Sequence, residues 1–125
     1  MRIAIDSDDA ATELKHELFG LLKSLEMDIE DLNYKDDDTT LYPAIGYNLA
    51  QQIKNKKYDR GILLCGTGIG MSIIANKVQG VYAAVCHDTF SAERSVKSND
   101  AQIITLGARV VGTELAKKIV LTWLD

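Results

Sequence analysis

The sequence is short of cysteine, basic clusters and long apolar runs, and each shortage excludes a class of protein. Its two cysteines form no CxxC pair, so they suggest neither a zinc site, nor a thioredoxin-like motif, nor a disulfide framework. No apolar stretch reaches the roughly 18 residues of a membrane-spanning helix, and residues 1–6 are too short an apolar run for a signal peptide. The net charge of −4, without a basic stripe, argues against nucleic acid. We therefore expect a cytoplasmic protein with reduced thiols and with no nucleic-acid or membrane partner.

What the chain does contain is typical of one globular domain. Of its 125 residues, 46% are hydrophobic and 26% are charged, which excludes a mainly disordered chain and provides enough apolar surface for a core. A chain of this length is expected to form a single domain over residues 1–125.

Strand-like and helix-like segments alternate along the chain. We expect strands over residues 2–6, 28–32, 61–65, 81–86 and 101–106. We expect helices over residues 11–25, from Tyr42 with Pro43 in the first turn, through 71–75, over 89–97 and over 113–124. The acidic run Asp36, Asp37 and Asp38 is expected to be a solvated loop. The alternation predicts an α/β fold: a single Rossmann-like three-layer domain, with a five-stranded parallel sheet and helices on both faces.

Ligands of such sheets bind at the carboxyl ends of the strands, and the sharpest feature there is the segment Cys65-Gly66-Thr67-Gly68-Ile69-Gly70. Its glycines let the backbone approach a ligand, and the following helix start offers free N–H groups. A thiol at this place is favoured as a thiolate, so Cys65 could abstract a proton while loop N–H groups stabilise an oxyanion. The spacing is neither that of the dinucleotide fingerprint nor that of a P-loop. A packing turn behind a buried cysteine is the alternative.

Polar residues also follow the other strands. Asp6, Asp8 and Asp9 cluster at the end of the first strand, where they suit contact with a polar ligand, and the alternative is that Asp8 or Asp9 caps the next helix. Arg109 follows the last strand and suits a phosphate or carboxylate, with a surface ion pair as the alternative. His87 lies at a strand end, and we favour a structural or peripheral role for it.

The remaining cysteine and histidine are expected to be structural. Cys86 ends an apolar strand without a glycine loop and is expected to be buried, whereas His16 is expected to face solvent. No metal site is predicted.

Three segments carry a resemblance to a known family: residues 59–77 (DRGILLCGTGIGMSIIANK), 86–92 (CHDTFSA) and 106–112 (LGARVVG). Together they resemble the ribose-5-phosphate isomerase B / galactose-6-phosphate isomerase family, in register over nearly the whole chain. The resemblance implies a cofactor-free aldose–ketose isomerase of small sugar phosphates. It further implies a homodimer or a dimer of dimers, with sites at the subunit boundary.

The resemblance also assigns roles residue by residue. Cys65 matches the catalytic base of the family. The oxyanion site corresponds to Gly66, Thr67, Gly68, Ile69 and Gly70, with Thr67 counted among the catalytic residues. Ligand-contacting positions of the family correspond to Asp8, Tyr42, Asn99 and Arg109.

This sequence departs from the family at three places. Ser98 stands where many members have the histidine that opens the sugar ring. Asp9 stands where ribose-type members have a histidine near the phosphate. Family members also continue beyond the equivalent of Asp125 with a tail whose arginines hold phosphate, and this tail is expected to be missing here.

The departures favour a substrate that forms no ring. A four-carbon sugar phosphorylated on O4 cannot close a five-membered ring, and residues 91–105 resemble the erythrulose-4-phosphate isomerase branch of the family. We therefore expect interconversion of D-erythrulose 4-phosphate and D-erythrose 4-phosphate. The alternatives are ribose 5-phosphate, another pentose or hexose phosphate, and a non-catalytic subunit of a two-chain isomerase. Retention of Cys65 argues against the last of these.

Overall fold

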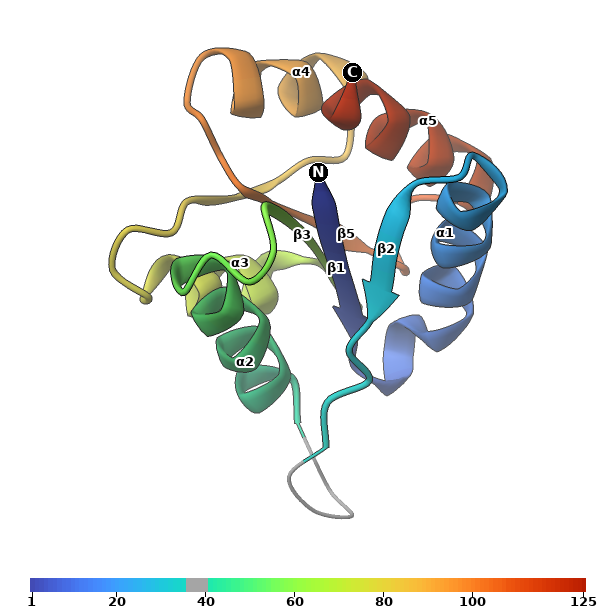
Figure 1. Ribbon diagram of the computed structural model, residues 1–125. Helices are drawn as coiled ribbons and strands as arrows, with labels where there is room; N and C mark the ends of the chain where they lie inside the picture. Colours follow the sequence, from blue (N-terminus) through green and yellow to red (C-terminus); the bar gives the residue numbers. More distant parts are fainter. Residues whose placement is uncertain (36–40) are drawn as a thin grey trace.

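The computed structural model describes residues 1–35 and 41–125, in which a five-stranded sheet lies between two layers of helices (Figure 1). The strands are β1 (Arg2–Ser7), β2 (Asp28–Asp31), β3 (Arg60–Cys65), β4 (Ala83–Val85) and β5 (Ile103–Gly107). The α-helices are α1 (Thr12–Ser24), α2 (Tyr42–Lys54), α3 (Ile69–Asn76), α4 (Thr89–Lys97) and α5 (Thr113–Leu124), and a 3₁₀ turn η1 (Asp9–Ala11) precedes α1. The acidic run Asp36, Asp37 and Asp38 lies outside the described residues. No described helix has the length and apolar character needed to span a bilayer.

All strand pairs are parallel, and the strand order is β2-β1-β3-β5-β4. The register pairs Ser7 of β1 with Leu64 of β3, and Cys65 of β3 with Gly107 of β5. The carboxyl ends of the three central strands therefore lie side by side at one edge of the sheet. This confirms the predicted α/β class with a parallel five-stranded sheet.

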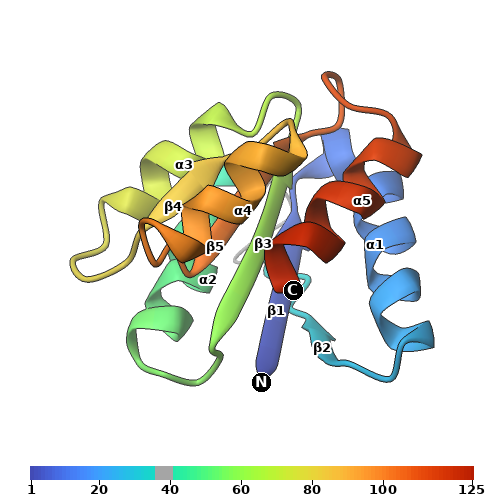
Figure 2. The same ribbon diagram turned by 90° about the horizontal axis from the view of Figure 1, so that it is seen from above.

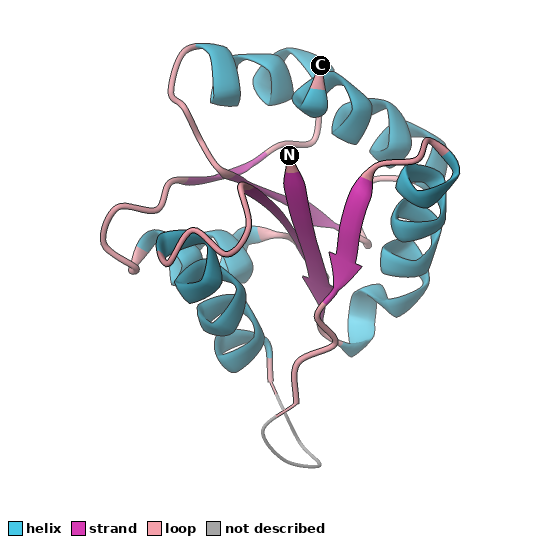
Figure 3. Cartoon of the chain, in the orientation of Figure 1, coloured by secondary structure: helices cyan, strands magenta, loops and turns pink. Residues whose placement is uncertain are grey.

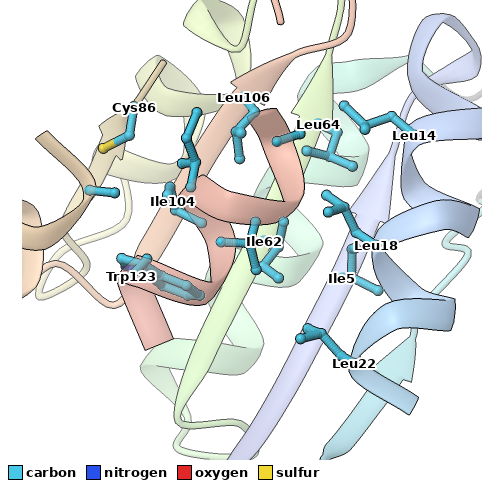
Figure 4. Close-up of a cluster of buried hydrophobic side chains, with 14 of the residues drawn as sticks. Ile5, Leu14, Leu18, Leu22, Ile62, Leu64, Cys86, Ile104, Leu106 and Trp123 are labelled. Atoms are coloured by element: carbon cyan, nitrogen blue, oxygen red, sulfur yellow. The ribbon is translucent and has the colours of Figure 1, made fainter. Parts of the chain in front are cut away.

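Alternation of side chains along the strands fills two separate cores. One face of the sheet is covered by α1, α4 and α5, and the other by α2 and α3, as the arrangement of helices in Figures 2 and 3 shows. On the first face, Leu18 and Leu22 of α1 and Trp123 of α5 pack on Ile5 and Ile62 (Figure 4). Cys65 points to the opposite face, where it packs with residues of α2 and α3.

The predicted elements agree closely with those observed, and the largest difference is at β4. Its expected span was 81–86, but only Ala83–Val85 are in the ladder. β4 is an edge strand, and side chains occupy its outer backbone groups. The amide of Asn76 donates to the carbonyl of Ala83 and accepts from its N–H, both at 2.8 Å. Just before β4, Gln102 accepts the N–H of Tyr82 at 2.8 Å on the side that faces β5.

Candidate active site

A pocket of about 420 Å³ opens at the carboxyl ends of β1, β3 and β5. Its lining comes from four segments that are distant in sequence, namely Asp8, Tyr42, Cys65, Gly66, Thr67, Ile69, Gly70, Ile73 and Arg109. The structure thus brings together the predicted base, most of the predicted oxyanion loop, and three of the four predicted ligand contacts.

Cys65 is the last residue of β3, and its side chain is almost completely buried beside the pocket. The N–H of Gly68 donates to Cys65 Sγ at 3.1 Å. The thiolate is the form of a cysteine that can accept a proton, and a backbone N–H is a suitable hydrogen-bond donor to it. Cys65 therefore lies where a base acting on a bound ligand would lie.

The glycine loop is held against β5 by backbone contacts. Ala108 and Arg109 donate their N–H groups to the carbonyls of Cys65 and Gly66 at 2.9 and 3.0 Å. A β-carbon on Gly107 would lie 2.6 Å from Cα of Thr67, so the two backbones touch directly. Only glycine at position 107 permits this approach.

Several donors belong to loop residues that line the pocket. Within the described parts of the chain, the N–H groups of Gly66, Thr67 and Gly70 donate to no protein acceptor. The hydroxyl oxygen of Thr67 accepts the N–H of Ile69 at 3.2 Å, which leaves the hydroxyl proton free to donate. Together with the N-terminus of α3, these groups can stabilise negative charge on a substrate oxygen.

Tyr42 forms one wall of the pocket by packing on Gly70. A β-carbon on Gly70 would lie 2.6 Å from Cε2 of the Tyr42 ring, so the ring sits on the bare backbone of α3. Tyr42 begins α2, with Pro43 in the first turn as expected. The apolar rim beside this ring is formed by Ile69 and Ile73, which are 55% and 54% exposed.

The three aspartates after β1 have different roles. Asp8 both caps η1, accepting the N–H of Ala10 at 3.0 Å, and lines the pocket. Burial raises the pKa of the Asp8 carboxyl, against the lowering effects of the Ala10 N–H and the Arg109 guanidinium. Asp9 is exposed in η1 and does not line the pocket.

Asp6 does not line the pocket. It is buried and accepts the N–H groups of Ser7 and Tyr34, and Lys15 lies 3.5 Å from its Oδ1. Lys15 also pairs with Asp31 at 3.1 Å. The hypothesis that Asp6 contacts a ligand is therefore wrong, because its oxygens are used within the fold.

Arg109 is exposed at the pocket mouth, and its guanidinium packs over the backbone of Gly66. No ion pair of Arg109 occurs among the described residues, so its donors are available to an anion.

His87 is half-buried, and its Nε2 accepts the N–H of Gly107 at 2.9 Å. This contact fixes the tautomer with the proton on Nδ1 and gives His87 a structural role, as favoured from the sequence. Cys86 is buried as predicted, and burial raises the pKa of its thiol. His16 is exposed, also as predicted.

Ser98 and Asn99 lie at the other end of the molecule. α4 runs back from the carboxyl edge, so these exposed residues follow its last turn at the amino edge of the sheet. There Gln102 pairs with Gly61, four residues before Cys65 along β3. At about 3.3 Å per residue, Gly61 and its partner Gln102 lie roughly 13 Å from Cys65 along the direction of β3. One chain therefore does not bring Ser98 or Asn99 to the pocket.

No cluster of three or more potential metal-ligating side chains occurs in the residues that the structure describes. The chemistry that the pocket itself offers is proton transfer at Cys65 beside a set of N–H and O–H donors, with one guanidinium at the mouth.

Comparison with known proteins agrees with this chemistry. Residues 3–125 match the family described as Ribose/Galactose Isomerase. The chain is 52% identical to a D-erythrulose-4-phosphate isomerase of Pectobacterium atrosepticum, over 100% of this chain and 83% of the relative. It is 50% identical to a Ribose-5-P isomerase B of Listeria innocua, over 100% of this chain and 84% of the relative. The structure of a Clostridium thermocellum ribose-5-phosphate isomerase B superimposes with a TM-score of 0.94 at 44% identity, covering 100% of this chain and 84% of that one.

Proposed function

The chain belongs to the ribose/galactose isomerase family, and we propose that it interconverts D-erythrulose 4-phosphate and D-erythrose 4-phosphate. The observation that carries the reaction type is Cys65, held by the Gly68 N–H beside a pocket lined with free donors. Support for the substrate comes from the 52% identical relative of that name and from Ser98 in place of the ring-opening histidine.

The proposed reaction moves one proton between neighbouring carbons. The Cys65 thiolate removes the proton from the carbon next to the carbonyl, and the electron pair passes to the carbonyl oxygen to give a cis-enediolate. The loop N–H groups and the Thr67 hydroxyl stabilise the charge on that oxygen. Cys65 then returns its proton to the former carbonyl carbon, while the hydroxyl proton of the neighbouring carbon passes to the former carbonyl oxygen and leaves the new carbonyl behind. The oxidation of one carbon and the reduction of the other cancel, so no redox cofactor is needed. A base of this kind needs a reduced thiol, which fits the cytosol.

Phosphate is proposed to bind on the cationic side of the pocket. Arg109 is the cation of the pocket lining, and the carboxyl of Asp8, which also lines the pocket, is suited to hydroxyl groups rather than to phosphate. A tetrose phosphate fits a pocket of about 420 Å³ that is open to solvent.

The proposed partner is a second copy of this chain. Ser98 and Asn99 can contribute to substrate binding only from another subunit, because within one chain they lie at the opposite edge of the sheet. The exposed apolar side chains of Ile69 and Ile73 at the pocket rim are suited to burial against such a subunit. A homodimer or dimer of dimers with shared sites is therefore proposed.

Mixed dimers test this arrangement. Cys65→Ser and Asn99→Ala chains, each inactive alone, are refolded together. One of the two sites in each mixed dimer would then combine an intact Cys65 with an intact Asn99, restoring up to about a quarter of normal activity. No recovery, or light scattering that shows an active monomer, would contradict the shared site.

Ribose 5-phosphate is the second candidate substrate, favoured by the 50% identical relative named for it. The two candidates are separated by measuring kcat/KM with both sugar phosphates. Because a missing acid–base group typically costs about 10²–10⁴-fold, we expect erythrulose 4-phosphate to be favoured by at least about 100-fold. Equal values for both substrates would overturn the proposed preference.

A further inference from the structure

Thr105 is a polar residue in a buried and otherwise apolar stretch of β5. It lies between Ile104 and Leu106, and its side chain has no exposed surface. Central strands of a sheet covered on both faces usually carry apolar β-branched residues at such positions, and valine has nearly the shape of threonine. A hydroxyl there costs free energy unless it forms a hydrogen bond, so its partner shows what it contributes.

The partner of this hydroxyl is the glycine loop. Thr105 Oγ1 donates to the carbonyl oxygen of Gly68 at 2.7 Å. The same oxygen accepts the N–H of Ser72 at 3.2 Å as α3 begins. The Gly68 carbonyl is therefore fixed from the sheet on one side and from the helix on the other.

The amide of the same residue holds the proposed base, since Gly68 N–H donates to Cys65 Sγ. Gly68 has φ +78°, and a β-carbon on it would lie 2.9 Å from the carbonyl carbon of Leu106. Glycine adopts positive and negative φ about equally well, so its own backbone does not select this conformation. The direction of its N–H depends on what holds its carbonyl, and Thr105 is the one side chain that does so among the described residues.

We propose that Thr105 is a positioning residue for Cys65: through the Gly68 carbonyl it fixes the N–H that stabilises the Cys65 thiolate. Thr105 does not line the pocket, so its effect reaches the substrate only through the loop. The proposal rests on the proposed function in taking Cys65 as the base, but the state of the thiol can be measured without any substrate.

The test compares variants that differ only in the hydroxyl, in a Cys86→Ser background that leaves Cys65 as the single thiol. Thr105→Val keeps the shape and removes the hydroxyl. Thr105→Ser and Thr105→Ala both lack the methyl group and differ in the hydroxyl, so they provide a second pair if the valine variant does not fold. Iodoacetamide alkylation near neutral pH reports the reactive thiolate, and the isomerase assay reports kcat and KM.

We expect alkylation and kcat to fall about tenfold in Thr105→Val, the change that corresponds to roughly 1.4 kcal/mol, with little change in KM. Thr105→Ser should stay near the unmodified protein, and Thr105→Ala should fall with the valine variant. Equal alkylation rates within each pair would overturn the proposal, even if the melting temperature drops. If no sugar phosphate is turned over at all, the proposed function fails, and the alkylation rates still decide the role of Thr105.

Discussion

The imidazole Nε2 of His87 accepts the backbone N–H of Gly107 at 2.9 Å. Because this nitrogen is occupied within the fold, it is not available to exchange a proton with a substrate. Gly107 in turn packs on Thr67 of the glycine loop. We therefore expect His87→Ala to lower kcat/KM for tetrose and pentose phosphates by the same factor, about 10-fold to 100-fold. His87→Gln, which can still accept the N–H, is the control and should lose less. Loss of ribose 5-phosphate activity alone in His87→Ala would identify His87 as a ring-opening group instead.

Cys65→Ser should abolish most turnover while leaving the fold intact. An alcohol is far less ionised than a thiol at neutral pH, so the base is lost, and kcat should fall by about 10²–10⁴-fold in steady-state assays. Cys86→Ser is the matched control, because Cys86 lies in the opposite core and lines no part of the pocket. A Cys65→Ser enzyme with normal turnover would refute the assignment of the base.

Ser98→His should add activity toward ring-forming substrates. A histidine can move a proton between the anomeric hydroxyl and the ring oxygen, which serine does poorly at neutral pH. We expect kcat/KM for ribose 5-phosphate to rise at least about tenfold, while the value for erythrulose 4-phosphate stays nearly constant. A similar rise for both substrates would mean that position 98 does not act in ring opening.

Gly70→Ala should disturb the pocket without weakening the fold. The added methyl group meets the Tyr42 ring and must displace it, so we expect kcat/KM to fall about tenfold. Stability should hold or rise, because alanine in a helix is favoured over glycine by up to about 1 kcal/mol. Gly20→Ala in α1 is the control: its β-carbon meets nothing within 4 Å, so only stability should change. Unaltered kinetics in Gly70→Ala would show that the Tyr42 wall does not matter for turnover.

Asp88 should make the free energy of unfolding depend on pH in the acid range. It caps α4 by accepting the N–H and the hydroxyl of Ser91, and these bonds lower the pKa of Asp88 below its ordinary value of 3.8. The folded form therefore binds the proton less readily than the unfolded chain does. The stabilisation of the folded state by ionised Asp88 is fully present above pH 3.8 and is lost as the pH falls through the folded-state pKa of Asp88.

The matched variant for this cap is Asp88→Ser, which keeps a capping oxygen but cannot titrate in this range. We expect the melting temperature of the unmodified protein to exceed that of Asp88→Ser at mildly acidic pH and to lose this advantage on further acidification. A constant difference across the titration would show that ionised Asp88 does not stabilise α4.

The alternation of elements was predictable because local sequence determines it. The spans expected for α4 and α5, 89–97 and 113–124, agree with the structure, since Asp88 and Gly112 stand before helices with clear apolar spacing. Cys65 and its glycine loop were found for a similar reason, because all six residues are contiguous in the chain.

Contacts between distant residues were not predictable in this way. The bonds from Thr105 to Gly68 and from Gly107 to His87 span 37 and 20 residues, and they depend on strand register. A polar residue in the run Ile103-Ile104-Thr105-Leu106 was the one available signal for the first of them. Asp6 was misread because its partners, Lys15 and Tyr34, meet it only after β1, α1 and β2 pack together.

The side-chain amide of Asn76 affects whether copies of the protein can aggregate through their sheet edges at high concentration. Exposed strand edges are templates for fibre growth, because a passing chain can bond to the free groups of the last strand. On β4 the outward donor and acceptor of Ala83 are both taken by Asn76, so an incoming strand would first have to break two bonds of 2.8 Å. At Ala83 that flank of the sheet is thereby protected from amyloid-like extension by a residue that does not line the pocket.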